Sequence, residues 1–322
     1  MSSYHGRRVL VTGAGGFIGH HLVGRLAAGG ARVRAMVRYN SADALGLLEP
    51  AGGVEVFPGD VTDPTRTRQA LDGCEIVFHL AALIAIPYSY RTRYSFTAAN
   101  VLGTQHVLEA AMETKPARLI CTSTSEVYGS AQSTPMSEDH PLAPQSPYAA
   151  SKVGADALAR SYHLSFGLPV AIVRPFNVFG PGQSARSVIP AVIVQALERD
   201  AIELGTLDTI RDFTYVDDTV DAFVRAGDGA PGAVFNVGTG EGRRIGDVVD
   251  RVGAILGKTL TVKTAQERLR PDSSEVDRLI CDASRMRALG WAPRVPFDDG
   301  LRRTIDWIRA HLVRYRREGF TI

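Results

Sequence analysis

A tyrosine and a lysine stand four residues apart in the stretch YAASK, residues 148–152. On a helix this spacing puts both side chains on one face. The positive charge of a lysine favours the phenolate form, so it lowers the pKa of a neighbouring tyrosine. Such a tyrosine can take the proton of a hydroxyl group while a hydride leaves the same carbon. Tyr148 and Lys152 are therefore predicted to form an acid–base centre for the oxidation of an alcohol.

Three further polar residues, Thr124, Ser125 and Glu126, follow an apolar run that is typical of a buried strand. Ligands of open α/β sheets bind at the carboxyl ends of the strands. We therefore expect these three side chains to reach the same crevice as Tyr148. A solvated loop carboxylate is the alternative interpretation of Glu126.

A glycine-rich turn lies near the N-terminus, in GAGGFIG, residues 13–19. Gly13 permits a tight turn, Gly16 lets the backbone approach a pyrophosphate, and Gly19 lets the following helix pack close to the strand. The start of that helix offers N–H groups and a positive dipole end to the anion. Because a strand precedes the turn and a helix follows it, the pattern predicts a dinucleotide site.

The residues after the second and third predicted strands bear on which dinucleotide binds. An Asp or Glu at the end of the second strand would bond the free 2′-OH of the adenosine ribose. The sequence has Val37 there, followed by Arg38, which could pair with a 2′-phosphate. NADP is therefore favoured over NAD, although Arg38 could equally be a solvated loop arginine. Asp60 is placed to meet the adenine amino group or to cap a helix.

The elements that position these residues alternate between strand and helix through the first half of the chain. Apolar runs predict six strands, at residues 8–12, 32–37, 54–58, 74–80, 118–122 and 170–174. Helical periodicity predicts helices at residues 17–29, 63–71, 94–113 and 148–166. This alternation predicts an α/β fold, a Rossmann doubly wound parallel sheet with helices on both faces.

The pattern loosens after Pro175, where prolines and glycines mark loops. We predict a dinucleotide-binding Rossmann domain over residues 1–175 and a smaller, mixed α/β substrate domain over residues 176–322. Its expected helices cover residues 188–198, 247–256 and 301–311, and its short strands cover residues 202–204 and 213–216. Strands near Phe213 and Phe235, within residues 211–240, could return to the first sheet.

The composition is that of an ordinary globular protein, with 45% hydrophobic and 22% charged residues among 322. The 36 Lys and Arg residues against 34 Asp and Glu argue against a nucleic-acid partner. No run approaches the roughly 18 apolar residues that span a bilayer, so no membrane partner is expected. Three scattered cysteines, and eight histidines without ligand spacing, predict no metal site and a reducing, cytoplasmic location.

Six motifs together resemble the extended short-chain dehydrogenase/reductases, and more narrowly the nucleotide-sugar epimerases and dehydratases. They are TGAGGFIG, HLAA, STSEVYG, SPYAASK, RPFNVFGP and RDFTYVDD, which begin at residues 12, 79, 123, 146, 174 and 211. The stretches at residues 81–90, 183–190 and 270–279 look most like the bacterial dehydratases of the legionaminic-acid type. Those enzymes act on UDP-N-acetylglucosamine or a close analogue.

The resemblance implies a tightly bound NAD or NADP. It assigns the cofactor to Gly13, Gly16, Phe17, Ile18, Gly19, Arg38, Asp60, Val61, Leu80, Ala81, Ala82, Asn100, Thr122, Tyr148 and Lys152. It assigns the nucleotide sugar to Ile84, Tyr88, Asn177, Arg186, Arg211 and Arg270. Arginine suits a diphosphate because its fork bonds phosphate oxygens bidentately. Solvated arginines, and ordinary packing of Tyr88, are the alternatives.

The resemblance also implies an assembly. Related enzymes pair the two helices predicted at residues 94–113 and 148–166 into a four-helix bundle between subunits. Both helices carry apolar residues on more than one face. A homodimer is therefore expected, and its bundle would hold the helix of Tyr148 rigidly.

The triplet at residues 124–126 implies the reaction. Thr-Asp-Glu or Thr-Ser-Glu marks 4,6-dehydratases in this family, where 4-epimerases carry Ser-Ala-Thr or similar. A 4,6-dehydratase oxidises C4, eliminates water across C5 and C6, and returns hydride to C6. Glu126 is implied as the base for the C5 proton. Ser125 stands where some dehydratases have an acidic Asp, so Glu126 would also deliver the proton to O6.

Three alternatives to the dehydratase stay open. UDP-glucuronate decarboxylases share the Thr-Ser-Glu triplet, so the triplet does not separate them from dehydratases. A nucleotide-sugar 4-epimerase is the second alternative. An NAD(P)-binding sensor is the third, and the intact set of Thr124, Tyr148 and Lys152 argues against it.

Overall fold

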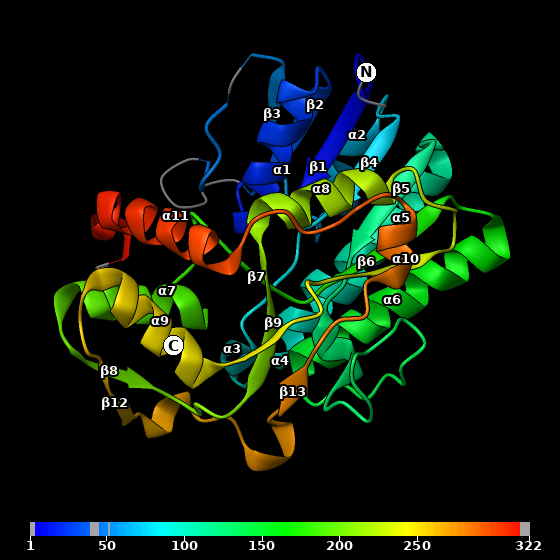
Figure 1. Ribbon diagram of the computed structural model, residues 1–322. Coiled ribbons are helices and arrows are strands. Elements are labelled where there is room, and N and C mark those ends of the chain that lie inside the picture. Colours follow the sequence, from blue (N-terminus) through cyan, green and yellow to red (C-terminus); the bar gives the residue numbers. More distant parts are fainter. Residues whose placement is uncertain (1–3, 39–44, 51, 316–322) are drawn as a thin grey trace.

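Seven parallel strands form one sheet in the order β10-β6-β5-β4-β1-β2-β3 (Figure 1). We describe a computed structural model of the chain, in which residues 4–38, 45–50 and 52–315 are described. The strands are β1 (Arg8–Thr12), β2 (Arg32–Val37), β3 (Val54–Pro58), β4 (Ile76–His79), β5 (Arg118–Thr122), β6 (Val170–Pro175) and β10 (Val234–Val237). The predicted Rossmann-type α/β fold is confirmed.

The strands form where the sequence offers continuous apolar runs. In β1, for example, Val9, Leu10 and Val11 are all fully buried, because helices cover both faces of the sheet. The observed bounds of β1, β2, β3 and β5 equal the predicted ones. The strand predicted over residues 74–80 is shorter, with β4 covering Ile76–His79.

Helices cover the sheet on both sides. On one side α1 (Phe17–Ala28) packs beside α8 (Val216–Ala226), and on the other α2 (Pro64–Leu71), α5 (Gly103–Thr114) and α6 (Pro147–Phe166) lie in a row. Two separate groups of buried side chains fill these layers. Helix α8 was not predicted, since its sequence follows the region where the apolar pattern loosens.

The long helix predicted over residues 94–113 is interrupted in the structure. A short helix, α4 (Arg93–Phe96), leads into a π-helical turn (Thr97–Leu102), and α5 follows. A further short helix, α3 (Ile86–Arg91), precedes α4. π-turns within helices are frequent at functional sites, and this one carries Asn100.

A second, smaller layer lies beyond the carboxyl ends of the large sheet (Figure 1). Its strands are β7 (Asn177–Phe179), β9 (Ile210–Tyr215), β11 (Gly242–Arg244) and β13 (Arg278–Leu279), with β8 (Ala201–Leu204) and β12 (Thr261–Thr264) as a separate pair. Its helices are α7 (Val188–Glu198), α9 (Ile245–Leu256) and α11 (Phe297–Ala310), whereas α10 (Ser284–Ala288) packs against β10 and α8 at the edge of the large sheet. Short 3-10 turns cover Ser125–Tyr128, Gln266–Arg268, Asp272–Ser274 and Leu312–Tyr315.

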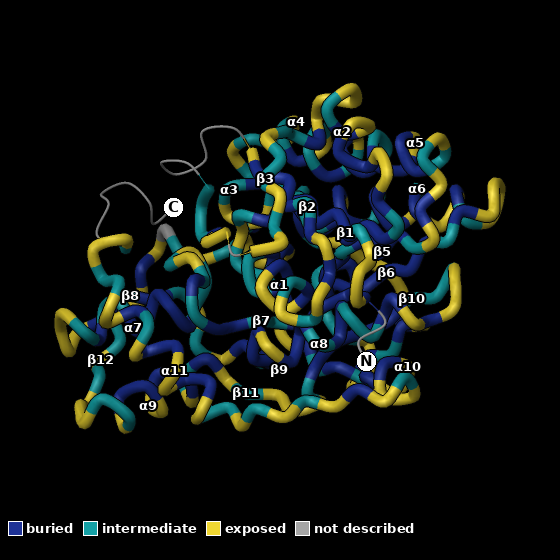
Figure 2. Tube along the Cα trace, turned by 90° about the horizontal axis from the view of Figure 1, so that it is seen from above, coloured by how far each residue is buried: buried dark blue, intermediate teal, exposed yellow. Residues whose placement is uncertain are grey.

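The chain crosses between the two layers more than once. The strand near Phe235, β10, pairs with β6 in the large sheet, whereas the strand near Phe213, β9, lies in the small sheet. The outermost residues of the two predicted domains, 1–3 and 316–322, lie outside the described residues. Buried residues run continuously through both layers, and exposed residues lie mainly in the outer loops and helix faces (Figure 2). Within the described part of the chain, no helix combines the length and the apolarity needed to cross a bilayer.

Candidate active site

The glycine turn between β1 and α1 has the shape of a phosphate cradle. Gly13 has φ of +70°, and a Cβ there would come within 2.7 Å of the Ala81 nitrogen. A Cβ on Gly19 would collide with the Gly13 carbonyl oxygen. Gly16 is the N-cap of α1 and makes no side-chain cap hydrogen bond to the first N–H groups of that helix. The turn therefore fits the pyrophosphate of a dinucleotide, since backbone and helix dipole both face the anion.

His79 at the end of β4 fixes the neighbouring HLAA segment. Its Nδ1 lies 2.9 Å from Thr12 Oγ1, and its Nε2 lies 3.1 Å from Thr104 Oγ1. The Thr104 hydroxyl donates to the Asn100 carbonyl at 2.6 Å, so His79 Nε2–H donates to the Thr104 oxygen. Burial, with the charge of Lys152, lowers the pKa of His79 to about 3. A neutral His79 therefore ties β4 to β1 and to α5, and through Thr104 to the Asn100 carbonyl in the π-turn.

Asn100 connects the cofactor side of the site to helix α6. Its Oδ1 accepts from the Leu83 N–H at 2.8 Å, and its Nδ2 donates to the Leu83 carbonyl at 2.9 Å. Nδ2 also donates to Ser151 Oγ at 2.9 Å, and Ser151 donates to the Tyr148 carbonyl at 2.7 Å. One buried amide thus sets the distance between the loop after β4 and the first turn of α6.

Tyr148, Thr124 and Glu126 come together at the carboxyl end of β5. Tyr148 lies in the first turn of α6, which begins at Pro147 after the N-cap Ser146. Its hydroxyl hydrogen-bonds the Thr124 side chain and lies within the field of the Glu126 carboxylate. Phe96 packs edge-on against the Tyr148 ring, with centroids 6.2 Å apart. Thr124 and Glu126 therefore lie beside Tyr148 at the carboxyl end of β5.

The pKa of Tyr148 differs from the prediction. Burial, together with the charges of Glu126 and Asp156, raises the pKa to about 12, against the lowering effect of the hydrogen bond with Thr124. Lys152 Nζ instead donates to the Thr122 carbonyl at 2.5 Å, and burial lowers the pKa of this lysine. The predicted lowering of the Tyr148 pKa by Lys152 is wrong here, because desolvation of the phenolate dominates and Lys152 is not among the charges that act on Tyr148.

Ser125 and Glu126 are the first two residues of a 3-10 turn whose side chains are largely buried. Thr124 caps this turn by accepting the Glu126 N–H at 3.3 Å. Ser125 is buried, and the Glu126 side chain is only 13% exposed. The interpretation of Glu126 as a solvated loop carboxylate is therefore wrong.

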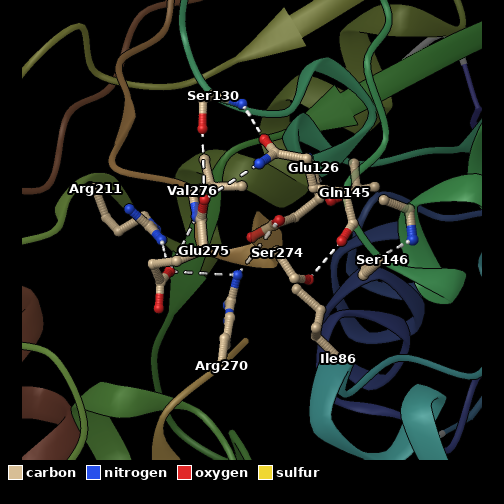
Figure 3. A network of polar contacts seen from close by, with 12 residues as sticks. Ile86, Glu126, Ser130, Gln145, Ser146, Arg211, Arg270, Ser274, Glu275 and Val276 are labelled. Atoms are coloured by element: carbon tan, nitrogen blue, oxygen red, sulfur yellow. Dashed lines mark hydrogen bonds and ion pairs between the residues drawn. The ribbon is translucent and has the colours of Figure 1, made fainter. Parts of the chain in front are cut away.

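Two arginines and a second glutamate lie beside Glu126 (Figure 3). Arg270 Nη1 lies 3.7 Å from Glu126 Oε2 and 3.7 Å from Glu275 Oε1. Arg211 Nη2 donates to Glu275 Oε1 at 3.3 Å. The side chains of Arg211 and Arg270 are 6% and 21% exposed, so neither is a solvated surface arginine. Burial lowers the pKa of Arg211, against the raising effect of Glu126.

A sequence profile described as GDP-mannose 4,6 dehydratase matches residues 10–304. The chain belongs to this family. The prediction of an extended short-chain dehydrogenase/reductase of the nucleotide-sugar dehydratase kind is confirmed.

Individual relatives agree with the family. A trifunctional UDP-glucose 4,6-dehydratase, epimerase and reductase of Arabidopsis thaliana is 31% identical to this chain. The match covers 95% of this chain and 48% of that protein. This chain thus spans about half the length of the first curated relatives that it matches. A UDP-glucose 4-epimerase of Mycolicibacterium smegmatis is 34% identical, over 94% of this chain and 98% of that protein. The crystal structure of the dTDP-glucose 4,6-dehydratase DesIV from Streptomyces venezuelae, with NAD bound, has a TM-score of 0.88 at 31% identity. That match covers 96% of this chain and 99% of DesIV.

The remaining predicted cofactor residues border the other half of the crevice. Arg38 is exposed directly after β2, and Asp60 follows β3. The Asp60 carboxylate accepts from the backbone N–H and the hydroxyl of Thr62, each at 2.9 Å. The N-cap of α2 is Asp63, so the interpretation of Asp60 as that cap is wrong. Of the other members, Phe17 and Ile18 start α1, Val61 follows β3, Leu80 and Ala82 follow β4, and Thr122 ends β5.

The remaining predicted substrate residues lie on separate elements and loops, whereas Arg211 and Arg270 lie close to Glu126. Tyr88 is half-buried against Phe96, with ring centroids 6.0 Å apart. Asn177 is half-buried at the start of β7. Arg186 and Ile84 are exposed, on the loop before α7 and the loop before α3. The structure therefore brings Arg211 and Arg270 to Glu126 but leaves Arg186 and Ile84 at the rim.

Sequence reasoning missed a buried polar network behind the site. Asp156 accepts from Ser123 at 2.8 Å and from Arg174 Nε at 3.0 Å. Arg174 also donates to the Tyr128 hydroxyl at 3.0 Å. Asp156 stands one turn after Lys152 on α6, a spacing that could have identified it. Among the described residues, no group of three or more His, Cys, Asp and Glu side chains is arranged to hold a metal.

Proposed function

We propose that the protein is a nucleotide-sugar 4,6-dehydratase that converts UDP-N-acetylglucosamine, or a close NDP-hexose, to its 4-keto-6-deoxy product. The observation that carries this proposal is the half-buried Glu126 beside the Tyr148–Thr124 pair. Dehydration needs a base for the C5 proton in addition to the group that deprotonates the C4 hydroxyl. Simple epimerisation at C4 needs no such second base.

Tyr148 and Thr124 are assigned to the C4 hydroxyl of the sugar. Tyr148 would accept the C4 hydroxyl proton as the phenolate, a form that burial disfavours and that the positive charge of oxidised NAD(P) would favour. Thr124 holds the phenol oxygen by the hydrogen bond described above. Bound NAD(P) supplies hydride acceptance and return. Lys152, anchored on the Thr122 carbonyl, adds a buried positive charge at this end of α6. The first turn of α6 thus positions the base.

Glu126 is assigned to the elimination. Its carboxylate takes the proton from C5, the C5–C6 double bond forms, and the C6–O bond breaks as the same proton passes to O6. Water leaves, and once hydride has been returned to C6 the C5 carbon takes up a proton from solvent, which Glu126 would deliver, so atoms and charges balance. Ser125 is a poor acid near neutrality, and therefore Glu126 acts first as the base and then as the acid.

The substrate is assigned to residues 176–322 together with the loops that follow the large sheet. Arg211 and Arg270 would hold the diphosphate, since both lie half-buried or buried next to Glu126. Asn177 and Arg186 would contact its outer end. Tyr88, and Tyr90 beside it, would border the sugar.

We further propose NADP as the preferred dinucleotide. The end of β2 carries Val37, which is buried, and then Arg38, which is exposed and could pair with a 2′-phosphate. Identification of the nucleotide released on denaturing the purified protein tests this. Recovery of NAD alone would contradict it.

The reaction is tested by incubating the protein with a panel of nucleotide sugars and measuring the masses of the products. Loss of one water from UDP-N-acetylglucosamine supports the proposal. Loss of carbon dioxide from a UDP-uronate would show a decarboxylase. An altered sugar of unchanged mass would show a 4-epimerase, the second candidate, which the similarity to the mycobacterial epimerase favours. Binding without turnover of any sugar would show a sensor.

A homodimer through α5 and α6 also belongs to the proposal. Leu164 and Phe166, near the end of α6, are 71% and 61% exposed, and Leu102 before α5 is 41% exposed. Exposed apolar side chains on neighbouring helices suit a subunit contact. Light scattering tests this, and a monomeric mass at micromolar concentration would contradict it. A cytoplasmic location remains a prediction for cell fractionation.

A further inference from the structure

Glu275 occupies an unusual position in the charged cluster. Its Oε1 lies between two guanidinium groups, 3.3 Å from Arg211 Nη2 and 3.7 Å from Arg270 Nη1 (Figure 3). The same oxygen accepts the N–H of Val276 at 3.1 Å. One carboxylate therefore stands between the two arginines that suit the two phosphates of a nucleotide sugar.

The contact with Arg270 leaves bonding capacity unused. Arg270 Nη1 is buried, yet it makes no hydrogen bond with any described residue. At 3.7 Å, both Glu126 and Glu275 are too distant for a hydrogen bond. An arginine fork forms two short, parallel bonds with a phosphate. A phosphate oxygen would thus satisfy the Arg270 fork better than Glu275 does.

The backbone that carries Glu275 is held firmly. Gln145 Nε2 donates to the carbonyls of Ser273 and Glu275, at 3.1 and 3.3 Å. Ser274 donates to the Gln145 carbonyl and lies 2.6 Å from the Tyr90 hydroxyl. A change at Glu275 therefore requires only rotation of its side chain, and the segment itself stays in place.

The net charge of this cluster affects how a diphosphate can bind to it. Arg211 and Arg270 contribute two positive charges, and Glu126 and Glu275 two negative ones, so the cluster is neutral overall. A diphosphate that enters a neutral cluster meets a carboxylate at the point where it needs the cations. The two phosphate groups of a diphosphate can give each arginine a bidentate partner of its own, whereas a single phosphate would have to be shared between the two arginines, as Glu275 Oε1 is.

We infer that Glu275 is a built-in competitor for the diphosphate site, whose side chain must rotate away from Arg211 and Arg270 when a nucleotide diphosphate binds. This inference rests on the proposed function, because that proposal places the diphosphate at these arginines. The competition would select for diphosphates over monophosphates. It would also weaken the hold on the nucleotide product.

The test compares binding to wild type, Glu275→Gln and Asp272→Asn by calorimetry, with the protein carrying its cofactor. Asp272 lies on the same short turn but is exposed, so its variant controls for loss of one negative charge. The probes are UDP, dTDP, GDP, UMP and inorganic pyrophosphate. We expect Glu275→Gln to bind the preferred nucleoside diphosphate about tenfold more tightly, and Asp272→Asn to bind it like wild type.

The outcomes separate the two proposals. Wild-type binding of a nucleoside diphosphate, with equal or weaker binding by a folded Glu275→Gln variant, overturns the inference alone. In that case Glu275 only holds the arginines in place. An equal gain for UMP and UDP would also overturn it, because competition would then not select for diphosphates. Absence of binding for every nucleotide in both proteins overturns the proposed function together with the inference.

Discussion

The two halves of the crevice are built from different interactions. On the cofactor side, His79, Asn100, Thr104 and Ser151 form a chain of neutral hydrogen bonds between 2.6 and 3.1 Å. On the substrate side, Arg211, Arg270, Glu126 and Glu275 form ion pairs of 3.3 to 3.7 Å, and one guanidinium nitrogen has no hydrogen-bond partner among the described residues.

Two ion pairs make the contrast sharper. Arg174 and Asp156 lie 3.0 Å apart, with side chains 6% and 7% exposed, and further hydrogen bonds satisfy both groups. Arg270 and Glu275 lie 3.7 Å apart and are each about one-fifth exposed. Buried charges are stable only when their partners are complete. The first pair is therefore a fixed structural support, whereas the second can exchange partners.

Tyr148 stands where the two halves meet, so its removal should have the largest effect. Tyr148→Phe deletes the group that takes the C4 hydroxyl proton. A general base contributes about 10²–10⁴-fold to the rate, and we expect a loss of at least that size. Product formation from the preferred nucleotide sugar measures it. Tyr94→Phe, at an 80% exposed position, is the control and should match wild type. Near-normal turnover by Tyr148→Phe would show that another group is the base.

Glu126→Gln should stop the reaction at a later point. The C4 hydroxyl can still be oxidised, but the C5 proton has no acceptor. The rate of dehydration should fall by about 10²-fold or more. A 4-keto sugar that keeps its C6 oxygen should accumulate instead. Mass spectrometry after trapping of the ketone detects this species. Turnover near the wild-type rate would remove the chief chemical support for a dehydratase.

Asn100→Ala tests whether the cofactor half is fixed by its hydrogen bonds. The change removes the Asn100 partner of the half-buried N–H and carbonyl of Leu83. We expect the free energy of unfolding to fall by about 2–4 kcal/mol. Denaturant titration measures it, with Thr97→Ala, an exposed change in the same π-turn, as the control. A loss as small as that of the control would show that the turn holds without Asn100.

The pH dependence of stability gives the smallest effect. His79 has a pKa of about 3 in the folded protein, below its ordinary value of 6.5, so only the unfolded chain takes a proton between these values. Stability should therefore fall as the pH drops below about 6.5, by up to about 1.4 kcal/mol per pH unit from this group. His79→Gln keeps polar atoms at the site and should reduce that slope. Urea titrations between about pH 4 and 6 measure the free energy of unfolding of both proteins. An equal dependence of this free energy on pH in wild type and His79→Gln would contradict the assignment.

Local patterns in the sequence determined most of the elements. The bounds of β1, β2, β3, β5 and α7 match the predicted ranges, because continuous apolar runs and helical periodicity are local properties. The pairing of Tyr148 with Thr124, and the approach of Glu126, followed from the rule that strand ends converge. The glycine turn could likewise be recognised from its place between a strand and a helix, and the φ of Gly13 and the close contacts of Gly13 and Gly19 explain why glycine stands there.

Tertiary structure decided what depends on contacts between distant segments. The π-turn interrupts a helix that the periodicity predicts as continuous, and it places Asn100 on Leu83 and Ser151. Glu275 meets Arg211 across 64 residues of chain, which no local pattern indicates. The pKa of Tyr148 rises although a lysine stands four residues away, because burial acts through the whole surrounding structure. Sequence spacing thus determined which groups are present, whereas packing determined their charge and their partners.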